Sequence, residues 1–552
     1  MYIRVYFLMR KALGLLLFLL IPWELQGAAE VHAVLVFPFE NQGSRSDLNW
    51  ISESFAEVIS SRLSGPGYYV LERNERNAAY DQLGIPADTP LTVASEYKAA
   101  QILGVDWAIL GDFDVKGDRL SASARLLDVR HLKLSSPIEV TGELADLVDL
   151  QTRLVWRLVA SYDTDFVVGT EEDFRRRFPD VRLDAFENYI RGILATDDLT
   201  REHFLLEADR LNPADHGAAY ALGQFFFDQK DYSNSAKWLK RLDAGDTHYY
   251  ESLFLLGVDE FFLGHYQSSE KAFEGTAREI PLNEVLNNIG VLKSRRAEYA
   301  EALDDFERAQ KGDPTDEDFC FNRGVALWNL HRYKAAEQTF EETIHLKDDD
   351  AEAHTLLAVV LGKLGDSAGE RRQVEWLSRN EIDSDTGLSR DVLPQPRLKK
   401  NFDGRAFRLL SLAVRNVLEE RLKGLSPAEH AAVHKSLGKK LASEERFSEA
   451  EHELTEATSL VPGDSDAHLS LAQTFEAGGK HQEAAGEFRT ALKLEDSFAG
   501  HFGLARVYVS LNQPEQARKE CEAALKFNPN SREAQELLRQ IPSRPSSRKK
   551  ES

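Results

Sequence analysis

Histidines and acidic residues are the side chains whose spacing in this sequence first suggests metal or catalytic chemistry. His430 and His434 stand four residues apart, so one helix face would carry both imidazoles. The zinc-protease pattern requires Glu directly after the first histidine, and Ala431 stands at that place. We therefore expect this pair to pack and not to bind a metal ion.

Four histidines recur at equivalent places of a repeated pattern, four residues before a small residue. Equivalent places in stacked helical units are separated by about 8–10 Å or more. Ligands of one zinc ion lie only about 2 Å from the metal, so these side chains cannot share an ion. We expect them to pack, each with one ring edge hydrogen-bonded. They are His354, His434, His468 and His501.

One acidic run could suggest calcium: Asp348, Asp349 and Asp350 are followed by Glu352. The run lacks the alternating ligands and the central glycine of an EF-hand loop, and a solvated turn between repeats is expected instead. The sequence has no Gly-rich phosphate loop, nucleophile elbow or convincing pair of catalytic carboxylates. It therefore predicts no enzyme, no catalytic residue, no metal site and no cofactor.

A repeat of about 34 residues positions these side chains between His216 and Pro529. In each copy a small residue is followed by a turn, an alanine and an apolar residue. Two helices approach closely only where one presents a small side chain, so each copy predicts a helix–turn–helix unit. The small residues are Gly223, Gly257, Gly290, Gly324, Ala358, Gly438, Ala472 and Ala505.

The pattern resembles the tetratricopeptide repeat family, in which pairs of antiparallel helices stack into a right-handed solenoid. Several positions recur together, including the alanines Ala302 and Ala336 and the unit-ending Pro314 and Pro529. The resemblance predicts a degenerate first repeat plus five units over 184–377, and three units with a capping helix over 428–541. Between them, 378–427 is expected to be an irregular insert with one amphipathic helix.

The resemblance also implies a concave groove lined by the first helix of each unit. Asn288 and Asn322 stand two residues before Gly290 and Gly324, and related folds use an asparagine on this helix to hold a peptide backbone. Asparagine is also frequent at this place as family background. The clamp that chaperone-binding relatives use for a terminal carboxylate is not reproduced. The residues predicted to bind a partner are Tyr220, Phe227, Phe254, Phe261, Phe262, Asn287, Asn288, Asn322 and Trp328.

An α+β domain is expected over 31–162, ahead of a charged linker at 163–183. Its predicted element order is β-α-β-α-α-β-β-β-α, with a hairpin at Gly117-Asp118 and the last strand over Leu132–Thr141. Val34–Asn41 and Ala108–Asp112 resemble the small domain of the amino-terminal part of TolB and of FlgO-type and curli-pore-type envelope proteins. That resemblance implies a role in envelope complexes and brings no catalytic residues.

Residues 1–29 have the outline of a secretory signal peptide: a basic start, a short apolar run and small residues before Glu30. An uncleaved signal anchor is the alternative. No further transmembrane span is expected after removal of this segment, and the tail 542–552 is expected to be disordered. The two cysteines, Cys320 and Cys521, are expected to be buried free thiols, which favours a bacterial periplasm.

The net charge of −24 disfavours binding to a phosphate backbone, so nucleic acid is not an expected partner. Together these features predict an exported or periplasmic scaffold without catalytic activity, an α+β domain followed by an all-α solenoid. It would bind a protein or peptide segment in its concave groove, within a cell-envelope complex. The alternative is an envelope assembly or transport component that oligomerises through 31–162.

Overall fold

The computed structural model describes residues 31–65, 67–86, 91–162, 169–178, 181–380, 394–422 and 424–541. The expected signal peptide and the expected disordered tail lie outside these residues. The chain forms two compact units. Unit 1 comprises Met1–Arg241 with Tyr250–Val417, and unit 2 comprises Leu242–Tyr249 with Leu418–Ser552.

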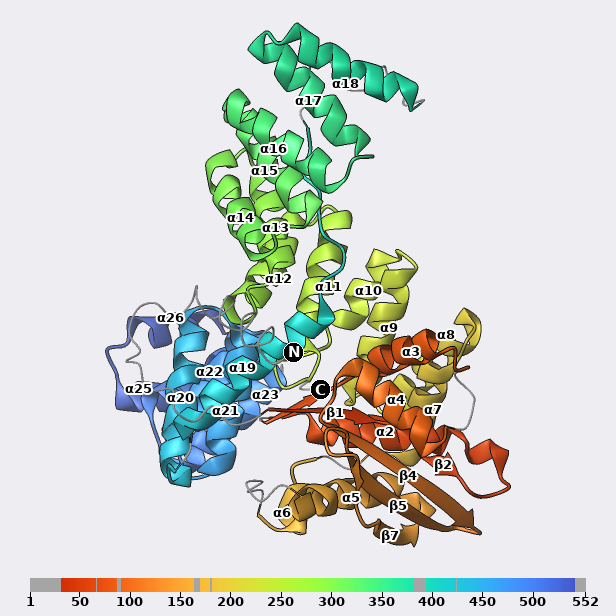
Figure 1. The fold of residues 1–552 in the computed structure, drawn as a ribbon. Coiled ribbons are helices and arrows are strands. Elements are labelled where there is room, and N and C mark those ends of the chain that lie inside the picture. The colour runs from red at the N-terminus through yellow and green to blue at the C-terminus, as the bar shows by residue number, and fades with distance from the viewer. Residues whose placement is uncertain are drawn as a thin grey trace, which may run out of the picture. The chain divides into compact units, whose positions relative to one another are not determined.

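A mixed sheet of seven strands forms the amino-terminal part of unit 1 (Figure 1). Its strand order is β3-β1-β4-β5-β6, with β2 beside β4 and β7 beside β5. Strands β1, β3 and β4 run parallel, and β4 and β5 form an antiparallel hairpin. The strands are β1 His32–Val36, β2 Glu40–Asn41, β3 Tyr68–Val70, β4 Trp107–Lys116, β5 Arg119–Asp128, β6 Lys133–Leu134 and β7 Ile138–Glu143.

The predicted hairpin turn is confirmed, since Gly117 joins β4 to β5 with a φ of 63°. One expected strand over Leu132–Thr141 is wrong, because β6 and β7 are separate there. Pro137 lies between them and has no amide hydrogen to donate to a sheet ladder, which accounts for the break.

Helices cover both faces of the sheet and bury two apolar clusters. On one face Phe55 and Leu154 pack against Phe39, and on the other Tyr80 and Ala99 pack near Phe37. The α+β fold class is therefore confirmed. The helices of this part are η1 Ser46–Leu48, α2 Trp50–Leu63, α3 Arg73–Leu83, α4 Val93–Leu103, η2 Leu144–Asp146, α5 Leu147–Tyr162 and α6 Glu171–Arg175.

Six helix pairs follow in sequence; we call them array 1 and refer to their first helices as the groove helices. They are α7 Leu183–Leu194 with α8 Asp198–Leu211, α9 His216–Asp228 with α10 Tyr232–Leu239, α11 Tyr249–Phe262 with α12 Tyr266–Glu279, α13 Asn283–Arg295 with α14 Tyr299–Gly312, α15 Glu317–Asn329 with α16 Tyr333–Leu346, and α17 Ala351–Leu364 with α18 Ser367–Arg379.

After α19 (Gly404–Leu422), unit 2 contains three more pairs and a terminal helix, which we call array 2. They are α20 Pro427–Ser443 with α21 Phe447–Leu460, α22 Ser465–Ala477 with α23 His481–Leu494, α24 Phe498–Ser510 with α25 Pro514–Phe527, and α26 Arg532–Gln540. None of the helices among the described residues is both long and apolar enough to cross a membrane.

In the pairs that have a glycine at the helix crossing, this glycine receives a large side chain from the second helix. A methyl group added at Gly290 would lie 2.7 Å from the ring of Phe306, and one at Gly324 would lie 2.6 Å from Phe340. Both rings are fully buried. The predicted close helix crossings are therefore present, and they leave no room for a side chain at these glycines.

Replacing Gly290 by leucine should force α13 away from α14. Overpacking of this kind typically costs about 1–3 kcal/mol of unfolding free energy. Gly486→Leu is a suitable control, because Gly486 also lies in a helix but has open space where its Cβ would be. Thermal melts should show a clear loss for Gly290→Leu and none for Gly486→Leu. Equal losses would contradict this account of the crossings.

Candidate functional site

A ten-residue extended segment, 394–403, lies along the groove helices of array 1; we call it the strap. It has no helix or strand, and Pro394 and Pro396 hold its start in an extended conformation. It runs against the order of the repeats, from α17 toward α11, before the chain enters α19 (Figure 1). Residues 394–403 of the insert expected at 378–427 thus return to array 1 and lie in its groove.

Two asparagines hold the backbone of the strap by paired hydrogen bonds. The side chain of Asn322 accepts from the amide of Arg397 at 2.6 Å and donates to its carbonyl oxygen at 2.7 Å. Asn288 does the same for Lys399, with both distances at 2.8 Å. Asn287 also donates to the Arg397 carbonyl at 3.0 Å. A carboxamide can play both roles at once, which is why this residue type suits an extended backbone.

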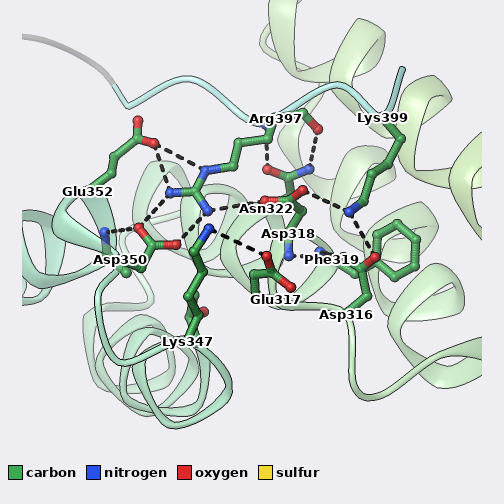
Figure 2. Close-up of polar contacts among 12 residues, drawn as sticks. Asp316, Glu317, Asp318, Phe319, Asn322, Lys347, Asp350, Glu352, Arg397 and Lys399 are labelled. Carbon is green, nitrogen blue, oxygen red and sulfur yellow. Dashed lines mark hydrogen bonds and ion pairs between the residues drawn. The ribbon is translucent and has the colours of Figure 1, made fainter. Parts of the chain in front are cut away.

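The Arg397 guanidinium enters a cluster of carboxylates at the starts of α15 and α17 (Figure 2). Its nitrogens lie 2.7 and 2.8 Å from the two carboxylate oxygens of Asp350. Asp318 and Glu352 accept from it at 3.1 and 2.9 Å. The guanidinium also stacks 3.6 Å above the ring of Phe321. This is the two-pronged geometry that distinguishes arginine from lysine.

Lys399 pairs with the neighbouring acids of the same cluster. Its ammonium lies 2.8 Å from Asp316 and 2.7 Å from Asp318, and 5.3 Å from the centre of the Phe319 ring. Asp316 is the N-cap of α15, as Asp350 is of α17. The same carboxylates therefore cap the groove helices and bind the basic side chains of the strap.

Burial alone would raise the pKa of both Asp350 and Asp318. A hydrogen bond from Arg397 to Asp350, and hydrogen bonds from Lys399 and Arg397 to Asp318, outweigh burial, so the pKa of each carboxyl lies below its usual value. A lowered carboxyl pKa contributes stability above its unfolded value, here 3.8, and that stability is lost as the pH falls through the lower folded value. The ion pairs of the strap therefore persist throughout the neutral range.

The far end of the strap is held by aromatic contacts. The Phe402 ring lies edge-on to Phe254, with centroids 4.8 Å apart, and Phe254 is fully buried. Lys400 places its ammonium 5.0 Å from the ring centre of Phe262 at the groove rim. Leu398 packs against the apolar cores of array 1.

The nine predicted residues fall into two groups. Asn287, Asn288, Asn322, Phe254 and Phe262 contact the strap. The other four contact residues of neighbouring helices of array 1: Tyr220 with Glu251, Phe227 with Tyr232, Phe261 with Tyr266 and Trp328 with Tyr333. Whether any of the nine binds a partner protein stays a prediction.

Sequence reasoning missed the acidic side chains of the groove. Asp348 and Asp349 form an exposed turn, as expected, but Asp350, which was expected in the same solvated turn, is buried and paired with Arg397. This part of the prediction is wrong. Acidic residues two apart at the starts of two groove helices, with Arg397 and Lys399 two apart in the insert, were the available signal.

The four recurrent histidines join the two helices of their units. The Nδ1 atom of each lies 2.6–2.7 Å from a side-chain oxygen nineteen residues later, as in His354 with Gln373 and His468 with Glu487. This is the packing role that their spacing predicted. The thiols of Cys320 and Cys521 are buried and not paired.

The corresponding face of array 2 is built differently. Ser436, Ser470 and Gly503 stand where array 1 has its backbone-binding asparagines. A cavity of about 400 Å³ opens between α20, α21 and α22, bordered by Leu469 and Gln473. The paired amide contacts that hold an extended backbone are therefore a property of array 1.

Known proteins share the repeat pattern. Two family models, both described as tetratricopeptide repeat, match the chain. One matches residues 296–360 and 476–541, and the other matches residues 202–248 and 436–499. No curated protein matches the chain.

Several solved structures are similar to part of this chain. A Parabacteroides merdae tetratricopeptide repeat protein is 16% identical over 52% of this chain and 97% of its own, with a TM-score of 0.23. Pseudomonas aeruginosa PilF is 14% identical over 36% and 93%, at 0.32. The second such domain of human RPAP3, solved with an HSP70 peptide, is 18% identical over 21% and 99%, at 0.21. The family models and the stacked helix pairs agree that this chain contains tetratricopeptide repeats.

Proposed function

We propose that this protein is an exported interaction scaffold that binds an extended segment of a partner protein in the groove of array 1. The observation that carries the proposal is the pair of asparagine contacts on the strap backbone. These contacts are hydrogen bonds to main-chain groups of the strap, so the same asparagines could bind any extended segment that replaced it. Catalysis has no part in this function.

The proposed place of action is the bacterial cell envelope, most simply the periplasm. Support comes from the signal-like residues 1–29 and from the resemblance of 31–162 to domains of envelope proteins. Two cysteines that are buried and not paired are compatible with such a compartment, because the fold does not depend on a disulfide.

Export predicts a defined mature chain. Cleavage after the small residues Gly27-Ala28-Ala29 should leave a protein that begins near Glu30. Amino-terminal sequencing of the protein from the periplasmic fraction measures this directly. A chain that keeps Met1 and stays in the cytosol would contradict export.

Groove binding predicts where a partner can be crosslinked in intact cells. A photoreactive residue at position 262 would stand at the groove rim, because Phe262 is 41% exposed beside the strap. It should give a partner adduct. In a chain whose strap is weakened by Arg397→Ala and Lys399→Ala, the further changes Asn288→Ala and Asn322→Ala should reduce that adduct at least about tenfold, or roughly 1.4 kcal/mol.

Two matched positions control this experiment. Leu199 on α8 is 82% exposed and does not contact the strap, so a photoreactive residue there should give no adduct. Val509 on α24 is 43% exposed in array 2. If only position 509 is crosslinked to a partner, recognition occurs in array 2 and this assignment is wrong.

A further inference from the structure

The contacts of the strap divide into a part that is neutral to sequence and a part that is selective. The asparagines bind main-chain groups alone. Selection comes from Asp316, Asp318, Asp350 and Glu352, whose ion pairs in the structure run to Arg397 and Lys399. These four carboxylates surround two cations that stand two residues apart in an extended chain.

The spacing of the two cations follows from the backbone geometry. In an extended chain, side chains two residues apart point to the same side, so Arg397 and Lys399 face the same carboxylates while Leu398 turns to the apolar cores. The intervening residue is therefore apolar and the flanking ones are basic. A segment with acidic side chains at the positions of Arg397 and Lys399 would bring negative charges next to the carboxylates of the groove helices and would be repelled.

We propose that the groove of array 1 selects a partner segment of the form basic–apolar–basic in extended conformation, and that the strap is a built-in competitor for that segment. This inference rests on the proposed function, since it assumes that array 1 binds a partner. The strap shows which chemistry the groove accepts, and it occupies the place that a partner would take.

A competing segment on the same chain lowers the apparent affinity of the groove for a free ligand by an amount that can be calculated. A segment on the same chain acts at an effective concentration on the order of 1 mM. If strap and partner bound equally well with a Kd of about 10 μM, the strap would weaken apparent partner binding roughly hundredfold. A loss of strap contacts should therefore make the groove easier to occupy.

The role of the cations in holding the strap has its own test. The amides of residues 397 and 399 donate hydrogen bonds to the side-chain oxygens of Asn322 and Asn288. Arg397→Ala should loosen the strap and therefore speed hydrogen exchange at both amides. Lys400→Ala is the matched control, because its ammonium lies over the rim ring of Phe262 and outside the carboxylate cluster. Equal exchange in the two variants would show that the carboxylates do not hold the strap.

The competition itself can be measured with the full chain and a labelled peptide of residues 394–404, PQPRLKKNFDG, which contains the strap sequence. Fluorescence anisotropy should show binding at least about tenfold tighter to the Arg397→Ala, Lys399→Ala chain than to the unaltered chain. Adding Asn288→Ala and Asn322→Ala to that chain should abolish the gain. A peptide with glutamine in place of its arginine and first lysine should bind at least about tenfold more weakly.

The chain with Arg397→Ala and Lys399→Ala must first show an unchanged circular dichroism spectrum and a single melting transition. If this folded chain binds the peptide no better than the unaltered chain does, the strap is a fixed brace and the inference is wrong. If it fails to fold, exchange of the strap amides in the unaltered chain with excess peptide decides the same question. Peptide binding without any crosslinked partner at position 262 would refute the proposed function and leave the competition intact.

Discussion

An extended backbone can lie buried in a groove only if its amide and carbonyl groups find hydrogen-bond partners. In this protein Asn322 and Asn288 supply those partners, and both side chains are fully buried beneath the strap. These paired bonds fix the backbone of residues 397 and 399, and this position places the Arg397 guanidinium within reach of the carboxylates of α15 and α17. An apolar residue in place of Asn288 would remove the partners of both the amide and the carbonyl of Lys399, and one in place of Asn322 would remove the partner of the Arg397 amide.

The solenoid fixes the distance between these asparagines. Each occupies the same turn of a groove helix, two residues before a glycine that receives a phenylalanine ring from the second helix. Close crossing at Gly290 and Gly324 therefore sets both the stacking of the units and the register of the backbone contacts. Acidic N-caps stand one repeat apart at the starts of α15 and α17, so the carboxylates that cap these two helices also bind the basic side chains of the strap.

Sequence reasoning could predict the repeat, the small residues at the crossings and the asparagines, because these depend on local periodicity. It could not predict that Asn322 would bind Arg397, because 75 residues separate the two and no local pattern connects them. For the same reason Asp350 was expected in solvent, although a distant arginine makes its burial tolerable. One expected strand is two strands because Pro137 interrupts a stretch whose other residues favour a continuous strand.

The central claim is that the strap is a replaceable occupant of the groove of array 1 and not a fixed part of the fold. Hydrogen exchange at the amides of Arg397 and Lys399 in the unaltered chain, with and without saturating unlabelled strap peptide, tests this most directly. The account predicts that excess peptide displaces the strap and speeds exchange at both amides, while the helices of array 1 stay protected. Unchanged protection of the strap at saturating peptide would contradict it.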